Sequence, residues 1–476
     1  MKTAPLKTVP LKTVPLKTVI VENTVCLNTG DAAILLAIRH ILKAAYPGEL
    51  RFQVFDSQPE VASRLYPSQA YPDIEIRKLL AESIFKYPYD DNRLKNLAKP
   101  IYNRLALSAL RHYGKSRALD ETMFSAGDRR SLQMYRQADL VVTTGGTYLV
   151  ENYNLERRLN QFRSDAVFGK DPVFFTQSMG PFDKDYNRRE LKPVFDRSPL
   201  ILLRDERSRG HLAGLVDNPG KCHVVADSVF ALADKERIEA LLSSGTPPQP
   251  TGRVGISVRH WNYVNDGADG MRRYMESIRD IATALVRDHG KQVTFVSTCQ
   301  GVPEYAHDDS KTAKAIVAEL APEIAAQVSV DANFHTPEQL MELVKGFDFV
   351  IATRMHMMIM SLCVGVPVLP IAYEFKTREL AKRVGLADLL LDIDTVTPEQ
   401  AGQKLRAFAG DLDRLRVTTL AAVLEEHASA MSASDLVRPL LADTSADVAG
   451  DGFPGLDKGA AGLRHGDHEG KRHRVA

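Results

Sequence analysis

The feature that most constrains the fold is a series of short apolar runs, each ending in small or polar residues and several followed by helical patterns. In the first half of the chain these runs begin at Lys17 and recur at residues 51–55, 138–146, 172–180, 200–208 and 222–230. Their hydrophobicity is continuous rather than alternating, which is typical of strands covered on both faces. The pattern predicts an α/β fold with a mostly parallel sheet.

A second α/β pattern follows the Pro/Gly/Ser-rich segment "SGTPPQPTG" at residues 244–252. It predicts strands at 253–259 and 292–298, helices at 271–289 and 336–347, and a strand, helix and strand within 348–373. A chain of 476 residues exceeds the usual size of one hydrophobic core. We therefore predict two Rossmann-like domains, at 17–243 and 253–440, joined by a linker at 244–252.

Three further segments depart from this alternation. "PLKTV" occurs three times within residues 5–19, and we expect residues 1–16 to be a disordered extension. Residues 441–476 are rich in Gly, Asp, His and Arg, which also favours disorder. Residues 57–137 interrupt the first domain, and we predict a helical, basic insertion there.

Composition excludes several classes of protein. A formal net charge of +1 argues against nucleic-acid binding through bulk positive charge. The longest apolar run, residues 357–372, is shorter than the roughly 20 residues of a membrane span and contains prolines, so it predicts buried core. Four widely spaced cysteines form no zinc motif. We expect a cytoplasmic protein without a metal site.

Arg354 and His356 stand at the head of that apolar run, directly after a predicted strand. A helix begins there, and its free N–H groups and dipole favour an anion. Arginine adds a fork that matches carboxylate or phosphate, and histidine can bind the same anion or transfer protons near neutral pH. The alternative is that Arg354 pairs with an interior acid and His356 only caps the helix.

Arg204 and Arg259 also end predicted strands. Each could form only a local salt bridge. Ligands of parallel sheets bind beyond the carboxyl ends of the strands, however, and three arginines and a histidine gather at such ends. A cleft between two such domains would bind a molecule with more than one negative group.

Glycines and acids at other strand ends are further candidates. Gly145 and Gly146 would let the backbone approach a ligand closely, or make a tight turn without one. Gly30 lies in a polar turn, and Asp31 and Asp227 could act as bases or bind hydroxyls. A carboxylate that caps a helix is the alternative, and Asp31 is a candidate N-cap.

The segment between Asn92 and Leu119 contains no acidic residue. Its seven basic residues are interleaved with leucines and an isoleucine: Arg93, Lys95, Lys99, Arg104, Arg111, Lys115 and Arg117. A basic amphipathic helix of this kind could lie on an anionic membrane surface. The alternative is a solvated helix face packed on its domain.

Taken in order, these motifs resemble the polysaccharide pyruvyl transferase family, and within it the colanic-acid biosynthesis type. The matching stretches span about residues 17 to 400: "NTGDAAILLA", "FDSQPE", "VVTTGGTYL", "TQSMGPF", "LLRDERS", "VADSVFAL", "GISVR" and "TRMHMMIMSLCVGVPVLPIAYEFKTREL".

The resemblance implies two Rossmann-like domains in a GT-B-like arrangement, with a cleft between them. It implies phosphoenolpyruvate as donor, a sugar as acceptor and a pyruvate ketal as product, with no cofactor. A lipid-linked acceptor and a place at the inner face of the plasma membrane are further expectations. Arg354 and His356 match the family's donor-binding Arg-x-His, with Met355 where leucine is common, and Arg204 matches its Arg-Asp motif. Arg259 is a looser donor-binding assignment.

We assign acid or base chemistry to His356, with Asp31 or Asp227 as a second group. Acceptor binding is assigned to Gly30, Asp31, Gly145, Gly146 and Glu374. Two other functions stay open at this point. One is a GT-B glycosyltransferase using a nucleotide sugar, and the other is a noncatalytic, envelope-associated sugar-binding protein.

Overall fold

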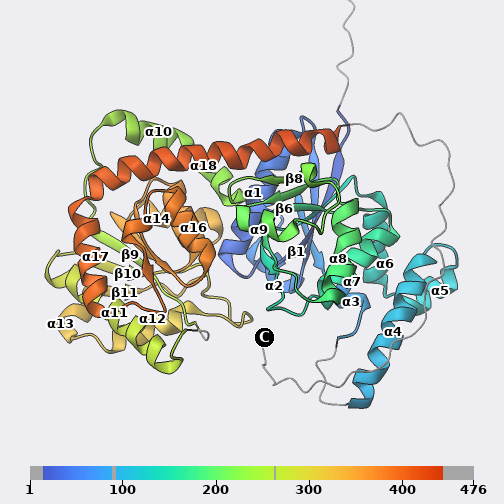
Figure 1. Cartoon of the computed structure of the whole chain (residues 1–476), viewed down its shortest axis with the longest axis horizontal. Helices are drawn as coiled ribbons and strands as arrows, with labels where there is room; N and C mark the ends of the chain where they lie inside the picture. Colours follow the sequence, from blue (N-terminus) through green and yellow to red (C-terminus); the bar gives the residue numbers. More distant parts are fainter. Residues whose placement is uncertain (1–13, 88–92, 262–263, 443–476) are drawn as a thin grey trace, which may run out of the picture. The chain divides into compact units, whose positions relative to one another are not determined.

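The computed structural model of the chain describes residues 14–87, 93–261 and 264–442, with backbone only at 93–97. The predicted extension, apart from residues 14–16, and nearly all of the predicted tail lie outside these residues. The described part forms one compact unit with two parallel sheets (Figure 1). We call the first sheet with its helices the first lobe, and the second sheet with its helices the second lobe.

The first sheet has eight strands in the order β3-β2-β1-β4-β6-β7-β8, with β5 paired to β6. Every pair is parallel, as the continuous apolar runs predict. The strands are β1 (Lys17–Thr24), β2 (Leu50–Asp56), β3 (Ile74–Lys78), β4 (Leu140–Thr143), β5 (Gly146–Leu149), β6 (Val173–Met179), β7 (Ile201–Leu203) and β8 (Cys222–Val224).

The second sheet has six parallel strands in the order β11-β10-β9-β12-β13-β14. They are β9 (Arg253–Ser257), β10 (Gln292–Phe295), β11 (Val328–Val330), β12 (Phe349–Ala352), β13 (Val368–Ala372) and β14 (Leu391–Asp392). In each sheet the strand order reverses beside the first strand, as in doubly wound folds. Ligands of such folds bind beyond the carboxyl ends of strands at this switch point.

Helices cover both faces of the first sheet. Val19 and Val21 of β1 pack in one core with α1, whereas Ile20 packs in another with α6. The first-lobe helices are α1 (Thr29–Ala45), α2 (Pro59–Leu65), α3 (Leu80–Ile84), α4 (Arg93–Arg111), α5 (Arg117–Met123), α6 (Ala126–Gln137), α7 (Glu156–Val167), α8 (Asp185–Arg197), α9 (Glu206–Leu212) and α10 (Lys235–Ser244), with 3-10 turns η1 (Pro219–Lys221) and η2 (Ser228–Leu232).

The second lobe ends in a long helix that returns to the first lobe. Its helices are α11 (Ala268–Arg287), α12 (Asp309–Ala318), α13 (Pro322–Ala325), α14 (Pro337–Val344), α15 (Met355–Cys363), α16 (Phe375–Arg383), α17 (Pro398–Gly410) and α18 (Leu412–Leu441), with the 3-10 turn η3 (Ala387–Leu389). Helix α18 packs against α1 and η2 (Figure 1). His427 of α18 also contacts the backbone oxygen of Phe230 at 2.9 Å.

Local sequence signals explain several helix boundaries. Thr336 caps α14 and Pro337 is its first residue, as predicted, and Gln339 completes a capping box. The prediction that Asp31 caps α1 is wrong. Asn28 precedes the first helical residue, and its side chain accepts the Gly30 N–H, so the cap is Asn28. Asp31 lies in the first turn and accepts a hydrogen bond from Asn28 Nδ2 at 2.9 Å.

The apolar run at 357–372 is buried throughout, in α15 and β13, as predicted. All four cysteines are likewise buried and free. Among the described helices, none combines the length and the hydropathy that crossing a membrane requires.

The segment 57–137 differs from the prediction in one respect. It is mostly helical, but it also contributes β3 to the edge of the sheet. In β3 the buried Ile74 is followed by the exposed Glu75, so the strand lacks the continuous apolar run that marks a central strand. Helices α4 to α6 pack on the sheet through a core of their own that includes Leu110, Leu132 and Tyr135.

Candidate functional site

A pocket lies between the carboxyl edge of the first sheet and helices α15 and α16 of the second lobe. It encloses about 280 Å³, counting its open mouth. Ser178, Arg204 and Asp227 line it from the first lobe, and Met355, Lys376 and Arg383 from the second. Three cationic side chains and three carboxylates, those of Asp205, Asp227 and Glu379, therefore line a single space.

Arg204 is the most completely bonded residue of the pocket. It follows β7 and is only 4 % exposed. Its Nε donates to Ser178 Oγ at 2.8 Å, its Nη1 to Asp227 Oδ2 at 2.7 Å and its Nη2 to Thr147 Oγ1 at 2.6 Å. These bonds fix the guanidinium, so its charge is preorganised toward the pocket.

His356 projects from the first turn of α15 toward the same carboxylate. Its Nε2 lies 3.8 Å from Asp227 Oδ2, within ion-pair range but beyond a hydrogen bond, and this buried nitrogen has no hydrogen-bond partner among the described residues. Burial opposes ionisation of Asp227, but the facing His356 and Arg204 outweigh it and hold the pKa of Asp227 below its ordinary value. The carboxylate is therefore anionic at neutral pH.

Gly30 makes room for His356. A Cβ atom at Gly30 would lie 2.7 Å from His356 Nδ1 and 2.8 Å from the histidine Cβ, closer than van der Waals contact permits. The start of α1 is also held by the second lobe, because Thr29 N donates to Thr298 O at 2.9 Å and Thr29 Oγ1 to His335 O at 2.7 Å. Gly30 therefore packs closely against the imidazole, which belongs to the opposite lobe.

Arg354 forms a buried ion pair. Its Nε and Nη2 donate to the two carboxylate oxygens of Asp309 at 2.8 and 2.7 Å, and Ser297 Oγ donates to Asp309 as well. Burial would lower the pKa of Arg354, but the Asp309 carboxylate raises it well above the ordinary value. The alternative considered from the sequence, that Arg354 pairs with an interior acid, is therefore present. Among the described residues, Nη1 of Arg354 has no hydrogen-bond acceptor.

Arg259 is held by aromatic rings instead of a carboxylate. Its guanidinium carbon lies 4.4 Å from the ring centroid of Trp261 and 4.2 Å from that of Tyr373. Its Nε is buried and has no hydrogen-bond partner among the described residues. Such cation–π contacts orient a guanidinium without neutralising its charge.

Lys376 and Glu374 begin α16 beside the pocket. Lys376 Nζ lies 2.6 Å from Glu374 Oε2. Burial raises the pKa of Asp31, whereas His356, Lys376, Arg354 and Arg204 act in the opposite direction. These cations from both lobes therefore lie within electrostatic range of Asp31.

The remaining predicted residues have packing roles. Met355 is 5 % exposed and lines the pocket. A Cβ at Gly145 would lie 2.9 Å from Phe175 O, so glycine there lets β4 approach β6. Gly146 has φ = +113°, which favours glycine, and it begins β5.

A second polar cluster lies deeper in the first lobe. Glu22, at the end of β1, accepts hydrogen bonds from Tyr135 Oη at 3.0 Å and Gln161 Nε2 at 2.8 Å, and Gln161 Nε2 also donates to Asp165 at 3.1 Å. Glu22 and Asp165 are fully buried. Burial raises the pKa of both carboxyls, and the neighbouring Glu22 charge raises that of Asp165 further. We call Glu22 and Asp165 the buried acid pair.

The structure brings several of the predicted site residues together. Arg204, Asp227 and Met355 line the pocket, His356 faces Asp227, and Gly30 contacts His356. Sequence reasoning missed Asp309, Lys376 and the buried acid pair. Asp309 lies 45 positions before its arginine, so no local motif could identify the pairing.

Comparison with known proteins identifies the family. Residues 28–374 match the family described as polysaccharide pyruvyl transferase. The chain belongs to this family. The match begins at Asn28, the cap of α1, and ends at Glu374, so every predicted site residue lies within it.

This member of the polysaccharide pyruvyl transferase family is also similar to a curated protein of Erwinia amylovora. The chain is 24% identical to "Amylovoran biosynthesis protein AmsJ" over 413 residues, which cover 84% of this chain and 94% of that protein. A pyruvyl transferase family implies a sugar or polysaccharide acceptor.

Solved structures support the GT-B-like fold. A UDP-N-acetylglucosamine 2-epimerase superposes with a TM-score of 0.52 at 13% identity, covering 94% of this chain and 100% of that chain. A putative UDP-N-acetylglucosamine 2-epimerase from Listeria monocytogenes gives a TM-score of 0.50 at 11% identity, covering 88% and 94%. At these identities the likeness concerns the fold alone, and it agrees with two parallel-sheet lobes.

Proposed function

We propose that this pyruvyl transferase moves the pyruvyl group of phosphoenolpyruvate onto two hydroxyls of one sugar, as a ketal, in exopolysaccharide or cell-envelope glycan biosynthesis. The observation that carries the proposal is the unpartnered His356 Nε2, buried 3.8 Å from the Asp227 carboxylate, which lines the pocket between the lobes. Family membership supports the transferred group. The proposed compartment is the cytoplasm.

The chemistry requires one net proton transfer and the loss of phosphate. One sugar hydroxyl adds to C2 of phosphoenolpyruvate, and a proton is delivered to C3, which becomes the methyl group. Phosphate then leaves C2, and the second hydroxyl adds there as it loses its proton. The two hydroxyl protons account for the methyl proton and for one proton released with phosphate. No redox step occurs, so the proposal includes no cofactor.

His356 suits the proton transfer because Nε2 is not committed to another group. An imidazole can donate the proton as an acid, and the ring can accept a proton when the second hydroxyl adds. Asp31 is the second candidate, since burial raises its pKa toward the range in which a carboxyl can hold a proton.

The donor is a small dianion or trianion, and it needs several positive charges. We propose that Arg204, Arg354 and Arg259 hold its phosphate and carboxylate, with Lys376 as a further cation. Arg204 and Arg354 already have carboxylate partners, so they supply oriented N–H groups rather than uncompensated charge. The acceptor would lie beside Asp31, Glu374 and the turn at Gly145 and Gly146.

Phosphate release from phosphoenolpyruvate across a panel of lipid-linked and nucleotide-linked sugars tests the proposal. We expect release with at least one acceptor, and loss of about 10²–10⁴ in rate for His356→Ala. His289→Ala, which changes an exposed histidine outside the pocket, is the matched control. Undiminished turnover by His356→Ala would refute the site, and transfer of a labelled sugar without phosphoenolpyruvate would favour the glycosyltransferase.

A further inference from the structure

Helix α4 has an exposed face that the proposed pyruvyl transfer does not use. On its inner side Ala106, Leu110 and, just after the helix, Tyr113 pack into the first lobe. On its outer side Ile101 and Leu105 are 62% and 60% exposed, one helical turn apart. Polar residues normally occupy the outer face of a packed helix, so two exposed aliphatic side chains in register indicate a contact surface.

Basic side chains surround these two residues. Arg104 and Arg111 are exposed and lie two turns apart on the same outer side, and Lys115 follows just beyond the helix. Among the described residues, no carboxylate forms an ion pair with any of the three. The sequence from 92 to 119 contains no acidic residue, so helix α4 has no carboxylate of its own to offset these charges.

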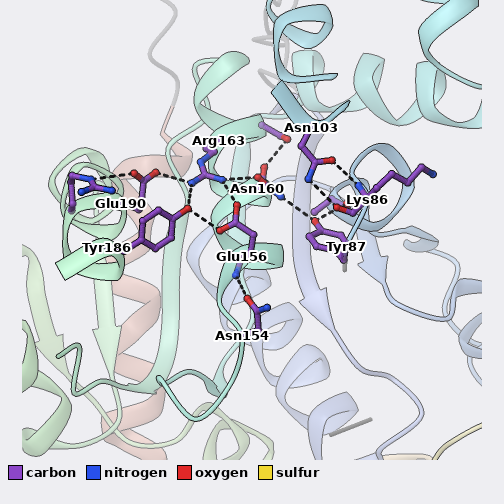
Figure 2. A network of polar contacts seen from close by, with 12 residues as sticks. Lys86, Tyr87, Asn103, Asn154, Glu156, Asn160, Arg163, Tyr186 and Glu190 are labelled. Carbon is purple, nitrogen blue, oxygen red and sulfur yellow. Dashed lines mark hydrogen bonds and ion pairs between the residues drawn. The ribbon is translucent and has the colours of Figure 1, made fainter. Parts of the chain in front are cut away.

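The helix is also held firmly in place. Asn103 Oδ1 accepts the Lys86 N–H at 2.8 Å, and Asn103 Nδ2 donates to Lys86 O at 2.9 Å. Figure 2 shows this contact next to Tyr87, which Asn160 of α7 approaches from the other side. Arg163 continues the network toward Glu190 of α8. Helix α4 therefore presents its outer face from a fixed position at the margin of the first lobe (Figure 1).

We propose that this face docks the protein on an anionic lipid surface. We define the docking face as Ile101, Arg104, Leu105, Arg111 and Lys115. Anionic headgroups attract the basic side chains, and the aliphatic side chains enter the boundary between headgroups and acyl chains. A polyanion such as nucleic acid could bind the basic side chains, but it has no apolar layer in which Ile101 and Leu105 could be buried. The proposal does not depend on pyruvyl transfer.

Vesicle sedimentation with the full chain tests the proposal. We expect the protein to sediment with vesicles of phosphatidylcholine and phosphatidylglycerol, but not with phosphatidylcholine alone, and to be released by salt. Arg104→Gln with Arg111→Gln should weaken partitioning about 30-fold, because each charge contributes roughly a factor of five. Ile101→Gln with Leu105→Gln should weaken it by at least about tenfold without a change of charge.

A matched control removes two exposed arginines elsewhere. Arg272→Gln with Arg287→Gln alters α11, where each arginine lies beside acidic partners, and should leave partitioning unchanged. Thermal unfolding of each variant shows that it folds. Equal binding to both vesicle types, or binding unaffected by either α4 pair, would overturn the proposal. So would a loss with the arginine pair alone, because Ile101 and Leu105 would then not enter the lipid.

Discussion

Two buried acidic clusters at the carboxyl edge of the first sheet have pKa values shifted in opposite directions. Asp227 faces Arg204 and His356, and its pKa is lowered. Glu22 lies against Asp165 with Tyr135 and Gln161 as neutral donors, and its pKa is raised. Burial acts in the same direction on both carboxyls. The neighbouring charges therefore decide which acid is an anion and which holds a proton.

The two clusters also differ in role: Asp227 belongs to the candidate site, whereas the buried acid pair stabilises the fold. Asp227 lines the pocket that both lobes share, where a permanent anion orients Arg204 and faces His356. The buried acid pair links β1 to α6 and α7 through hydrogen bonds. A perturbed pKa alone would have selected both clusters as functional.

The largest expected effect comes from Asp227→Ala. It leaves the Arg204 guanidinium buried without its charge partner, which should cost about 3–5 kcal/mol of unfolding free energy. Urea unfolding measures this cost. Asp73→Ala breaks a bidentate pair with the partly exposed Arg39 and should cost only about 1 kcal/mol. Equal costs for the two variants would contradict the special role assigned to the Asp227 cluster.

Gly30→Ala should disturb the same cluster from the opposite lobe. The new Cβ would overlap His356, so we expect a loss of about 1–3 kcal/mol and a displaced imidazole. If His356 is the acid or base, the rate of phosphate release should fall about 10²-fold. Thermal unfolding and turnover measure the two effects.

Gly127→Ala provides the matched control. Gly30 and Gly127 are both the second residue of a helix, α1 and α6. A Cβ at Gly127 would lie no closer than 3.7 Å to Ser125 Oγ, an ordinary contact. This variant should be neutral or stabilised by about 0.5–1 kcal/mol. If Gly30→Ala behaves in the same way, the close packing on His356 is not important.

The sequence predicts the parallel sheets and the place of Arg354 and His356, because apolar runs and helix starts are local patterns. It does not predict partners. Arg354 pairs with Asp309 and Arg204 with Asp227 only after the chain has folded. Edge strand β3 and the buried Glu22 were missed for a related reason, since a half-exposed strand alternates and an acid at the end of an apolar run gives no sign of burial.

Glu22→Gln tests the other half of the comparison, with a smaller effect that depends on pH. Folded Glu22 binds its proton more tightly than the unfolded chain does, because its pKa is raised. Its contribution to stability is therefore largest below the ordinary pKa of glutamate, and it declines as the pH rises through the folded-state pKa.

The variant keeps an acceptor oxygen for Tyr135 and Gln161 but cannot ionise. As the pH rises from 6 to 8, the unmodified chain should therefore lose stability relative to the variant, by roughly 1 kcal/mol of unfolding free energy. Urea unfolding at both pH values measures the difference, with the exposed Glu236→Gln as control. Asp227 responds in the opposite sense, because its lowered pKa stabilises the fold above the ordinary pKa of aspartate. A Glu22→Gln variant with an unchanged pH dependence would mean that Glu22 is ionised like Asp227, and the contrast between the two clusters would disappear.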